Sequence, residues 1–89
     1  IIMSSTAEEK VKTAEEEMKA VAQRFSKNLY IMMGTGKRWK ARELAKVSGV
    51  SENTISRIKN DSEGKEYPKL ETIVRLALAF QIDPTDLLK

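Results

Sequence analysis

The stretch Ala41–Asn60, ARELAKVSGVSENTISRIKN, decides how this chain folds. It holds two short segments whose apolar residues have helical spacing, joined at Gly49. Ala45 is small enough to let two helices approach closely, and a glycine can take a positive φ that costs other residues a Cβ clash. The stretch therefore predicts a helix over 41–48, a tight turn, and a second helix over 51–60.

Two helices crossed in this way form a helix-turn-helix, in which the second helix stands proud of the domain and fits a major groove of duplex DNA. Any corner between two helices needs a small residue and a glycine, so those two features alone would also fit a purely structural corner. The spacing agrees along the whole of Ala41–Asn60. This agreement favours the DNA-binding motif over the structural one.

A long helix is predicted ahead of this motif. Apolar residues recur every three or four positions between Ala7 and Met32, which predicts a helix from about Thr6 to Met33, interrupted near Ser26. Ser5 and Thr6 are candidate N-caps because a glutamate follows each of them three residues later. The apolar stripe is a thin heptad seam, so the helix could be a dimerisation arm, a brace on its own domain or a docking helix for another protein. We favour self-association or bracing.

The remaining sequence also predicts helices. Trp39 lies in the connection before residue 41, where we expect it to wedge between the first helix and the next. Pro68 leads into a helix over about 69–80, and Asp83 with Pro84 begins a last short helix. We expect an all-α fold of about five helices, with residues 1–24 as an N-terminal helical extension and residues 25–89 as the helix-turn-helix domain.

Composition narrows the function. The 89 residues suffice for one small domain, and the chain has no cysteine and no histidine, which removes the common nucleophilic and zinc chemistries. We therefore expect no enzyme, no cofactor and no metal. No apolar run approaches the ~20 residues of a membrane span and no signal peptide is visible, so we expect a cytoplasmic protein that does not contact a membrane.

The charges are unevenly distributed. The net charge is +3, but residues 1–20 hold three lysines and five glutamates, a net charge of −2. Residues 24–59 hold nine basic and two acidic side chains, a net charge of +7. A basic block of this kind indicates a polyanionic partner, although a solvated basic surface would have the same composition.

Six short motifs resemble one known family. They are Asn28-Leu29, Glu43-Leu44-Ala45, Gly49-Val50-Ser51, Thr54-Ile55-Ser56-Arg57-Ile58, Pro68-x-Leu70-Glu71-Thr72-Ile73 and Asp86-Leu87-Leu88. With these motifs, residues 25–88 resemble the lambda-repressor-like helix-turn-helix domain, of the XRE type and similar to phage Cro. The resemblance implies a compact five-helix fold, sequence-specific binding of double-stranded DNA, and usually a homodimer that regulates transcription.

The resemblance also implies which residues read DNA bases. They are the exposed positions early in the second helix of the motif, namely Glu52, Asn53, Ser56 and Arg57. The chemistry agrees, because asparagine can bond adenine with two hydrogen bonds, arginine can do the same to guanine, and glutamate can accept from cytosine. Glu52 could instead act only on the helix dipole, and Arg57 could contact only phosphate.

Phosphate contacts are expected around these residues. The candidates are Lys37, Arg38, Lys40, Arg42, Thr54, Asn60 and Lys65. Two positions depart from the family pattern: Ala41 stands where many members have a phosphate-bonding glutamine, and Asp61 stands where glycine is usual. The loop over 62–67 is also longer than is typical, which puts contacts near Lys65 in doubt.

These features predict a dimeric transcriptional regulator, acting as a repressor that blocks a promoter. An antitoxin of a toxin–antitoxin pair shares the fold and the DNA binding but adds a toxin as a protein partner. A third reading is a protein-interaction module that uses the N-terminal helix and leaves the groove-binding face idle. DNA binding that depends on sequence and salt distinguishes the first two readings from the third.

Overall fold

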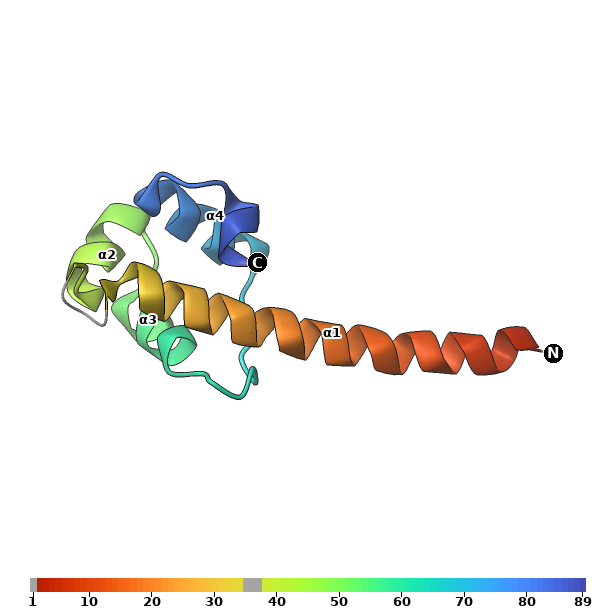
Figure 1. Ribbon diagram of the computed structural model, residues 1–89. Helices are drawn as coiled ribbons and strands as arrows, with labels where there is room; N and C mark the ends of the chain where they lie inside the picture. Colours follow the sequence, from red (N-terminus) through yellow and green to blue (C-terminus); the bar gives the residue numbers. More distant parts are fainter. Residues whose placement is uncertain (1, 35–37) are drawn as a thin grey trace.

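The computed structural model describes residues 2–34 and 38–89, with side chains from residue 13 onward (Figure 1). The elements in chain order are α1 (Ile2–Met32), α2 (Ala41–Ser48), α3 (Glu52–Lys59), α4 (Leu70–Phe80) and the 3-10 helix η2 (Pro84–Leu87). No strand occurs in these residues. The expected all-α class is thus confirmed for this part of the chain.

Helix α1 is longer and more regular than expected. It begins at Ile2, so Ser5 and Thr6 lie inside the helix and the prediction that they cap it was wrong. It also runs through Ser26 without the expected interruption. The hydroxyl of buried Ser26 donates to the carbonyl oxygen of Lys59 at 3.3 Å, so it bonds the end of α3. A serine engaged in this way does not compete for the backbone of its own helix.

The core forms where the second half of α1 meets the other helices. Phe25, Leu29 and Met33 are completely buried, and so are Leu44, Ile55, Leu76 and Leu87. They belong to one cluster to which every element contributes. Since a chain of this size has room for only one core, α1 belongs to the domain from about residue 22 onward.

The last short helix, predicted to begin at Asp83 and Pro84, is the 3-10 helix η2. Its hydrogen bonds span three residues: the N–H of Asp86 donates to the carbonyl of Asp83, and that of Leu88 donates to Thr85. The hydroxyl of Thr85 and, with a smaller effect, its backbone N–H donate hydrogen bonds to the carboxylate of Asp83 and lower the pKa of that carboxylate. The cap therefore contributes its full stabilisation of the fold when the pH is above 3.8, the ordinary pKa of this carboxylate. That stabilisation is lost as the pH falls through the lowered pKa of Asp83 in the folded state.

Two side chains of α1 hold the C-terminal turn. Asn28 donates to the carbonyl oxygen of Leu87 at 2.9 Å, and Arg24 donates to that of Leu88 at 2.9 Å. Both carbonyls lie at the end of η2, where the last carbonyl groups of a helix have no partner within it. These bonds join residues that are about 60 positions apart and close the domain onto α1.

Trp39 packs further along the domain than expected. Its ring meets Phe80, the last residue of α4, edge-to-face with centroids 5.8 Å apart. The indole is half-buried against the core cluster. The connection between α1 and α2 is thereby held against the end of α4, in addition to the two helices that flank it.

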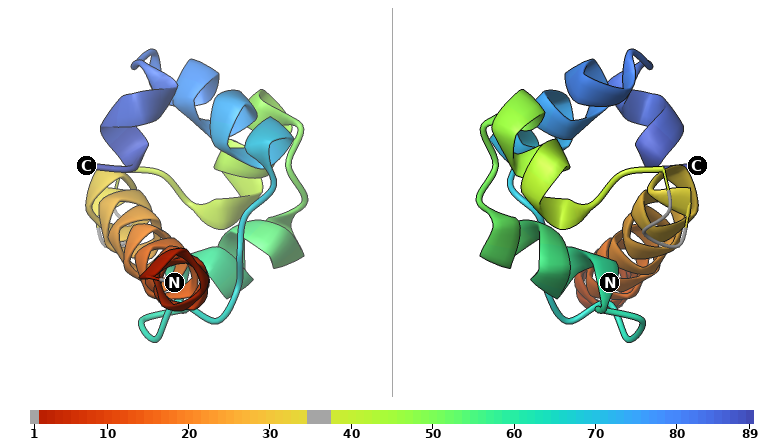
Figure 2. Two further views of the ribbon diagram at one scale, coloured as in Figure 1. Left: turned by 90° about the vertical axis from the view of Figure 1, so that its right-hand side faces the viewer. Right: turned by 90° about the vertical axis from the view of Figure 1, so that its left-hand side faces the viewer.

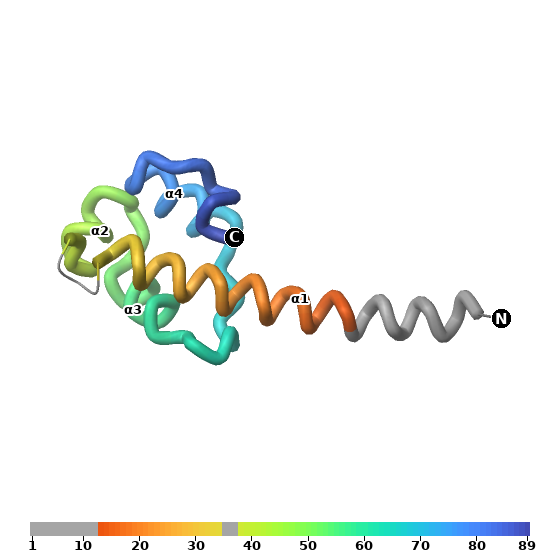
Figure 3. The backbone as a smooth tube through the Cα atoms, viewed as in Figure 1, coloured from red at the N-terminus to blue at the C-terminus, as the bar shows by residue number. Residues whose placement is uncertain are grey.

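The first half of α1 projects from the domain. Residues 13–19 are all exposed, and the molecule measures 54 Å along its longest axis against 22 and 19 Å along the others. Figure 3 follows the backbone of this segment from residue 13 into the domain. The expected domain boundary at residue 24 therefore falls within an unbroken helix and stays a prediction. No helix in the described part of the chain has the length and apolar character to cross a membrane.

Candidate nucleic-acid interface

The turn between α2 and α3 is fixed by two residues. Gly49 caps α2 with φ 77° and ψ 7°, and its N–H donates to the carbonyl of Ala45 at 2.9 Å. The hydroxyl of buried Ser48 donates to the carbonyl of Leu44 at 2.6 Å and accepts from the N–H of Val50 at 3.1 Å. Both ends of the turn are thus hydrogen-bonded, which sets the angle at which α3 leaves α2.

Helix α3 is anchored on one face and free on the other. Ser51 is its N-cap and accepts from the N–H of Thr54 at 3.1 Å. Ile55 and Ile58 turn inward, with 0% and 5% of their surface exposed. The four predicted base-reading residues remain on the outer face, where Ser56 is half-buried and the others are exposed: Glu52, Asn53, Ser56 and Arg57.

The hydroxyl of Thr54 accepts a hydrogen bond within the cap of α3. The Ser51 hydroxyl donates to the Thr54 oxygen at 2.7 Å, so the Thr54 hydroxyl keeps its own proton to donate. Thr54 is half-buried at the edge of the outer face of α3. This is the position expected of a group that contacts phosphate.

The N-terminus of α2 has free donors. Lys40 is the N-cap residue, and its side chain makes no capping hydrogen bond to the first turn. The first N–H groups of a helix have no partner within the helix, so they can bind an anion. Lys40 and Arg42 are exposed beside them. Arg38 is exposed at the hollow that also holds Trp39, whereas Lys37 lies outside the described residues.

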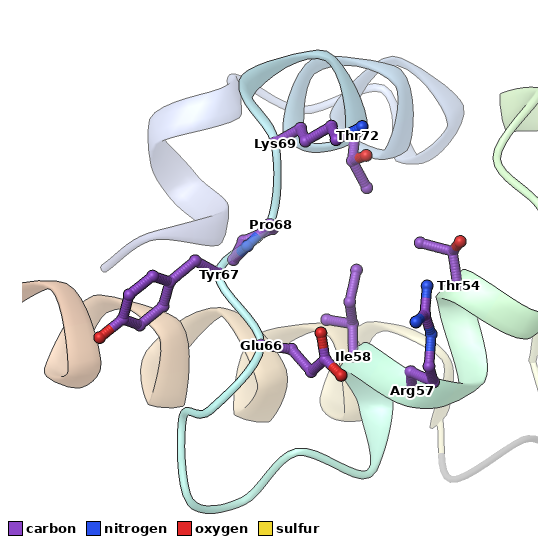
Figure 4. A pocket seen from close by; sticks show the side chains of 8 residues that line it. All are labelled: Thr54, Arg57, Ile58, Glu66, Tyr67, Pro68, Lys69 and Thr72. Carbon is purple, nitrogen blue, oxygen red and sulfur yellow. The ribbon is translucent and has the colours of Figure 1, made fainter.

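A notch of about 250 Å³ lies between α3 and the segment that enters α4 (Figure 4). Thr54 and Arg57 reach it from α3, and Lys69 and Thr72 line it from the opposite side. The carboxylate of Glu66 points toward α3 from the same segment as Lys69. Arg57 thus lines the notch on the same side as Thr54, at one edge of the outer face of α3. Lys69 and Thr72 were not among the predicted site residues.

The loop after α3 is closed by the aspartate that replaces the usual glycine. The carboxylate of Asp61 accepts from the N–H groups of Lys65 and Glu66 at 2.9 and 2.7 Å. Its charge is therefore engaged with the loop backbone, where two N–H donors stabilise it. The side chain of Gln23 on α1 donates to the carbonyl of Glu63 at 3.5 Å, so the loop packs on α1.

Lys65 is placed differently from the other predicted phosphate-contacting residues. It lies in a hollow with Lys19 and Gln23 of α1, and its ammonium pairs with Glu63 at 2.8 Å. Thr54 and Arg57 instead line the notch. The structure thus brings Lys65 together with α1 and not with the outer face of α3.

Gly64 makes the packing of this loop feasible. Its φ is +71°, and a Cβ atom there would lie 2.6 Å from the backbone oxygen of Lys19. We expect Gly64→Ala to lower the free energy of unfolding by about 1–3 kcal/mol, because both the conformation and the contact are unfavourable. Chemical denaturation measures this loss.

Gly49→Ala is the matched control for that variant. Its φ is +77°, but a Cβ atom would meet only the flexible end of Arg75, at 2.9 Å. We expect a loss of about 1 kcal/mol there, from the backbone conformation alone. Equal losses in the two variants would show that contact between the loop and α1 adds nothing to stability.

Two side chains of α1 that were not among the predicted site residues lie beside the end of α3. Lys27 and Tyr30 of α1 line a hollow with Lys59 and Asn60 at the end of α3. Tyr30 is 45% exposed although it adjoins completely buried Leu29. A lysine at position i and a tyrosine at i+3 lie on the same side of a helix. This spacing, next to an apolar position, is the sequence signal that could have identified the pair.

The comparisons with known proteins agree with this geometry. No curated protein and no solved structure matches the chain. Residues 28–89 match the family model of the Cro/C1-type helix-turn-helix DNA-binding domain, and this range contains α2, α3 and the tight turn that joins them. Since the match covers more than half of the chain, the chain belongs to the Cro/C1-type helix-turn-helix DNA-binding family.

Proposed function

We propose that this protein is a transcriptional repressor that binds, as a homodimer, an operator with two half-sites in double-stranded DNA. The observation that supports this most strongly is the outer face of α3. Four polar side chains occupy it while the opposite face is buried in the core of a domain from a DNA-binding family. A helix presented in this way fits a major groove.

In this proposal, the outer face of α3 reads the bases. Asn53 bonds adenine and Arg57 bonds guanine, each with two hydrogen bonds, while Glu52 accepts from cytosine. Glu52 also disfavours nearby phosphates, so it contributes to specificity more than to affinity. Ser56, which is half-buried, donates or accepts at the base edge nearest to it.

The phosphate contacts surround that face. Lys40 and Arg42 bring positive charge to the free N–H groups of α2, and the Thr54 hydroxyl donates from the start of α3. Lys27, Tyr30 and Asn60 continue the surface past the other end of α3. Lys65 contributes least, because its ammonium is paired with Glu63.

Repression follows from occupancy. Two recognition helices about 34 Å apart lie in successive major grooves and exclude other proteins from the promoter. Affinity comes mainly from the basic surface and selectivity from the outer face of α3.

We expect Lys40→Ala to weaken binding to every duplex by a similar factor. The lysine ammonium neutralises a phosphate and does not read a base, so the slope of log K against log salt should fall by about 1. Fluorescence anisotropy at several salt concentrations, with one selected and one scrambled duplex, measures both quantities. A loss confined to the selected duplex would contradict this role.

Selection of bound duplexes from a random DNA library at physiological salt tests the proposed function. We expect enrichment of an inverted repeat whose half-sites are about one helical turn apart. Enrichment of a lone half-site would retain DNA reading and remove the dimer. If no sequence is enriched, the proposed function is wrong and the working surface lies elsewhere on the chain.

A further inference from the structure

An apolar hollow of about 450 Å³ lies where α1 leaves the domain. Residues 14–22 of α1 form one wall, and the other wall comes from the approach to α4, from α4 and from the C-terminus. The apolar side chains that line it are Met18, Val21, Tyr67, Pro68, Ile73 and Leu88. Met18 is 47% exposed and Tyr67 is 56% exposed, so these large apolar groups face the solvent.

The hollow continues the core stripe of α1 into the solvent. Phe25 is completely buried and Ala22 is 2% exposed, whereas Met18 and Ala14, further along the same stripe, are exposed. The sequence extends the stripe with Val11. A helix stripe that stays apolar after it has left its own domain needs another surface to cover it.

We propose that a second copy of this chain covers the stripe, with the two α1 helices antiparallel and Met18 at the two-fold axis. The α1 residues that line the hollow, 14–22, are centred on Met18. The projecting end of each helix then lies in the hollow of the other copy. The same chain supplies both the hollow and its occupant, so the contact is self-complementary and closes as a dimer.

Charge favours the antiparallel arrangement. Residues 1–20 carry a net charge of −2, and the rest of the chain carries +5. Antiparallel packing lays the acidic end of one copy on the basic domain of the other. Parallel packing would set two acidic ends side by side and leave both hollows uncovered, so it loses on charge and on apolar burial alike.

The arrangement also sets the spacing of the recognition helices, a step that rests on the proposed function. The end of α3 is hydrogen-bonded to Ser26 of α1. At 1.5 Å per residue, that residue lies about 12 Å along the helix from Met18, and Leu29 lies about 17 Å away. The two copies of α3 are therefore displaced by roughly 24–33 Å along the paired helices, and the upper end of this range is close to the ~34 Å between successive major grooves.

The proposed dimer also allows both copies of α3 to face one straight DNA duplex. Viewed along α1, both α2 and α3 lie to one side of that helix (Figure 2). A two-fold axis that points toward this side places both copies of α3 on the same face of the dimer. A single straight duplex can then contact both.

Sedimentation of the whole chain tests the dimer. We expect a species of twice the 10.1 kDa of one chain at tens of micromolar, and a single-chain species for Met18→Glu. Leu78→Glu is the matched control, since it makes the same kind of change at an apolar residue that is 69% exposed on α4. A monomeric wild type, a dimeric Met18→Glu variant or a monomeric Leu78→Glu variant would each overturn the proposal.

Engineered cysteines test the direction of packing, because the chain has none of its own. At the two-fold axis of an antiparallel pair, Met18 faces Met18 of the other copy, whereas Ala14 faces Ala22. We therefore expect mild oxidation to cross-link Met18→Cys and not Ala14→Cys. Cross-linking of Ala14→Cys would indicate parallel helices, and failure of both variants to cross-link would remove this interface.

A duplex with one half-site separates this inference from the proposed function. The Met18→Glu variant should bind it with the same base preference as the wild type and should lose only the gain from a second half-site. Loss of base preference in the wild type itself would instead contradict the proposed function and leave the dimer as a separate result.

Discussion

Replacing Phe25 with alanine is expected to lower the free energy of unfolding by about 3–5 kcal/mol. The ring is completely buried in the cluster to which every element contributes. Its removal leaves a cavity where α1 enters the domain, and closely packed interiors relax only partly around such a cavity. Because a domain of 89 residues has a total stability of only about 4–13 kcal/mol, a substantial fraction should unfold near physiological temperature.

Urea denaturation followed by circular dichroism measures this change, and Ile31→Ala on the same helix is the control. Ile31 is 56% exposed, so its replacement should change stability by no more than about 0.5 kcal/mol. If the Phe25→Ala variant lost less than about 1 kcal/mol in the free energy of unfolding, Phe25 would not be the residue that joins α1 to the core. The decisive quantity is the difference between the stability losses of the two variants, because both substitutions lie on the same helix.

Replacing Asn53 or Arg57 with alanine is expected to cost about 1–3 kcal/mol on the selected operator, roughly 5-fold to 150-fold in affinity. Each variant should also accept other bases at one position of each half-site, because its paired hydrogen bonds are lost there. Repeating the duplex selection with each variant measures both effects. The losses should be smaller on scrambled DNA, where no base is read.

The Arg57→Ala variant has a second possible result, because Arg57 also lines the notch. Lys69 and Thr72 lie on the opposite wall of the notch. Contact with phosphate alone would make the Arg57→Ala variant lose affinity equally for all duplexes, with a salt slope lower by about 1, as for Lys40→Ala. An unchanged base preference in the Asn53→Ala variant would be more serious, since it would contradict base reading by the centre of the face.

The local parts of this fold could be predicted from the sequence. Helix α2 occupies the predicted residues 41–48, and Ser51 and Asp83 are the caps of the elements that follow them. Each depends on signals within a few residues, such as a capping oxygen, a glycine or a short apolar stripe. The start of α1 was misplaced, because Ser5 and Thr6 resemble caps but the helix continues past them to Ile2.

The candidate site was less accessible to sequence reasoning where contacts are distant. The bond from Ser26 to Lys59 joins residues 33 positions apart, and Gly64 meets α1 at Lys19, 45 positions before it. No local pattern encodes such a contact. The role of Asp61 was likewise hidden: the sequence marks it only as a departure from the family pattern, whereas its carboxylate accepts from the N–H groups of Lys65 and Glu66.

The unbroken course of α1 through Ser26 makes this helix a molecular ruler. In the dimer that we propose, no hinge separates the projecting end of α1 from the domain, so the separation of the two domains is set by the number of residues between them and their relative orientation by the number of helical turns. Inserting seven residues after Ala20 would lengthen each arm by about 10 Å and rotate it by about −20° from its original phase. Because Val21 and Ala22 also line the hollow, the proposed dimer of such a protein should be weaker, and the operators that it chooses should have half-sites that lie further apart. An insertion of two residues, which turns the arm by about 200°, should prevent both domains from contacting one face of DNA.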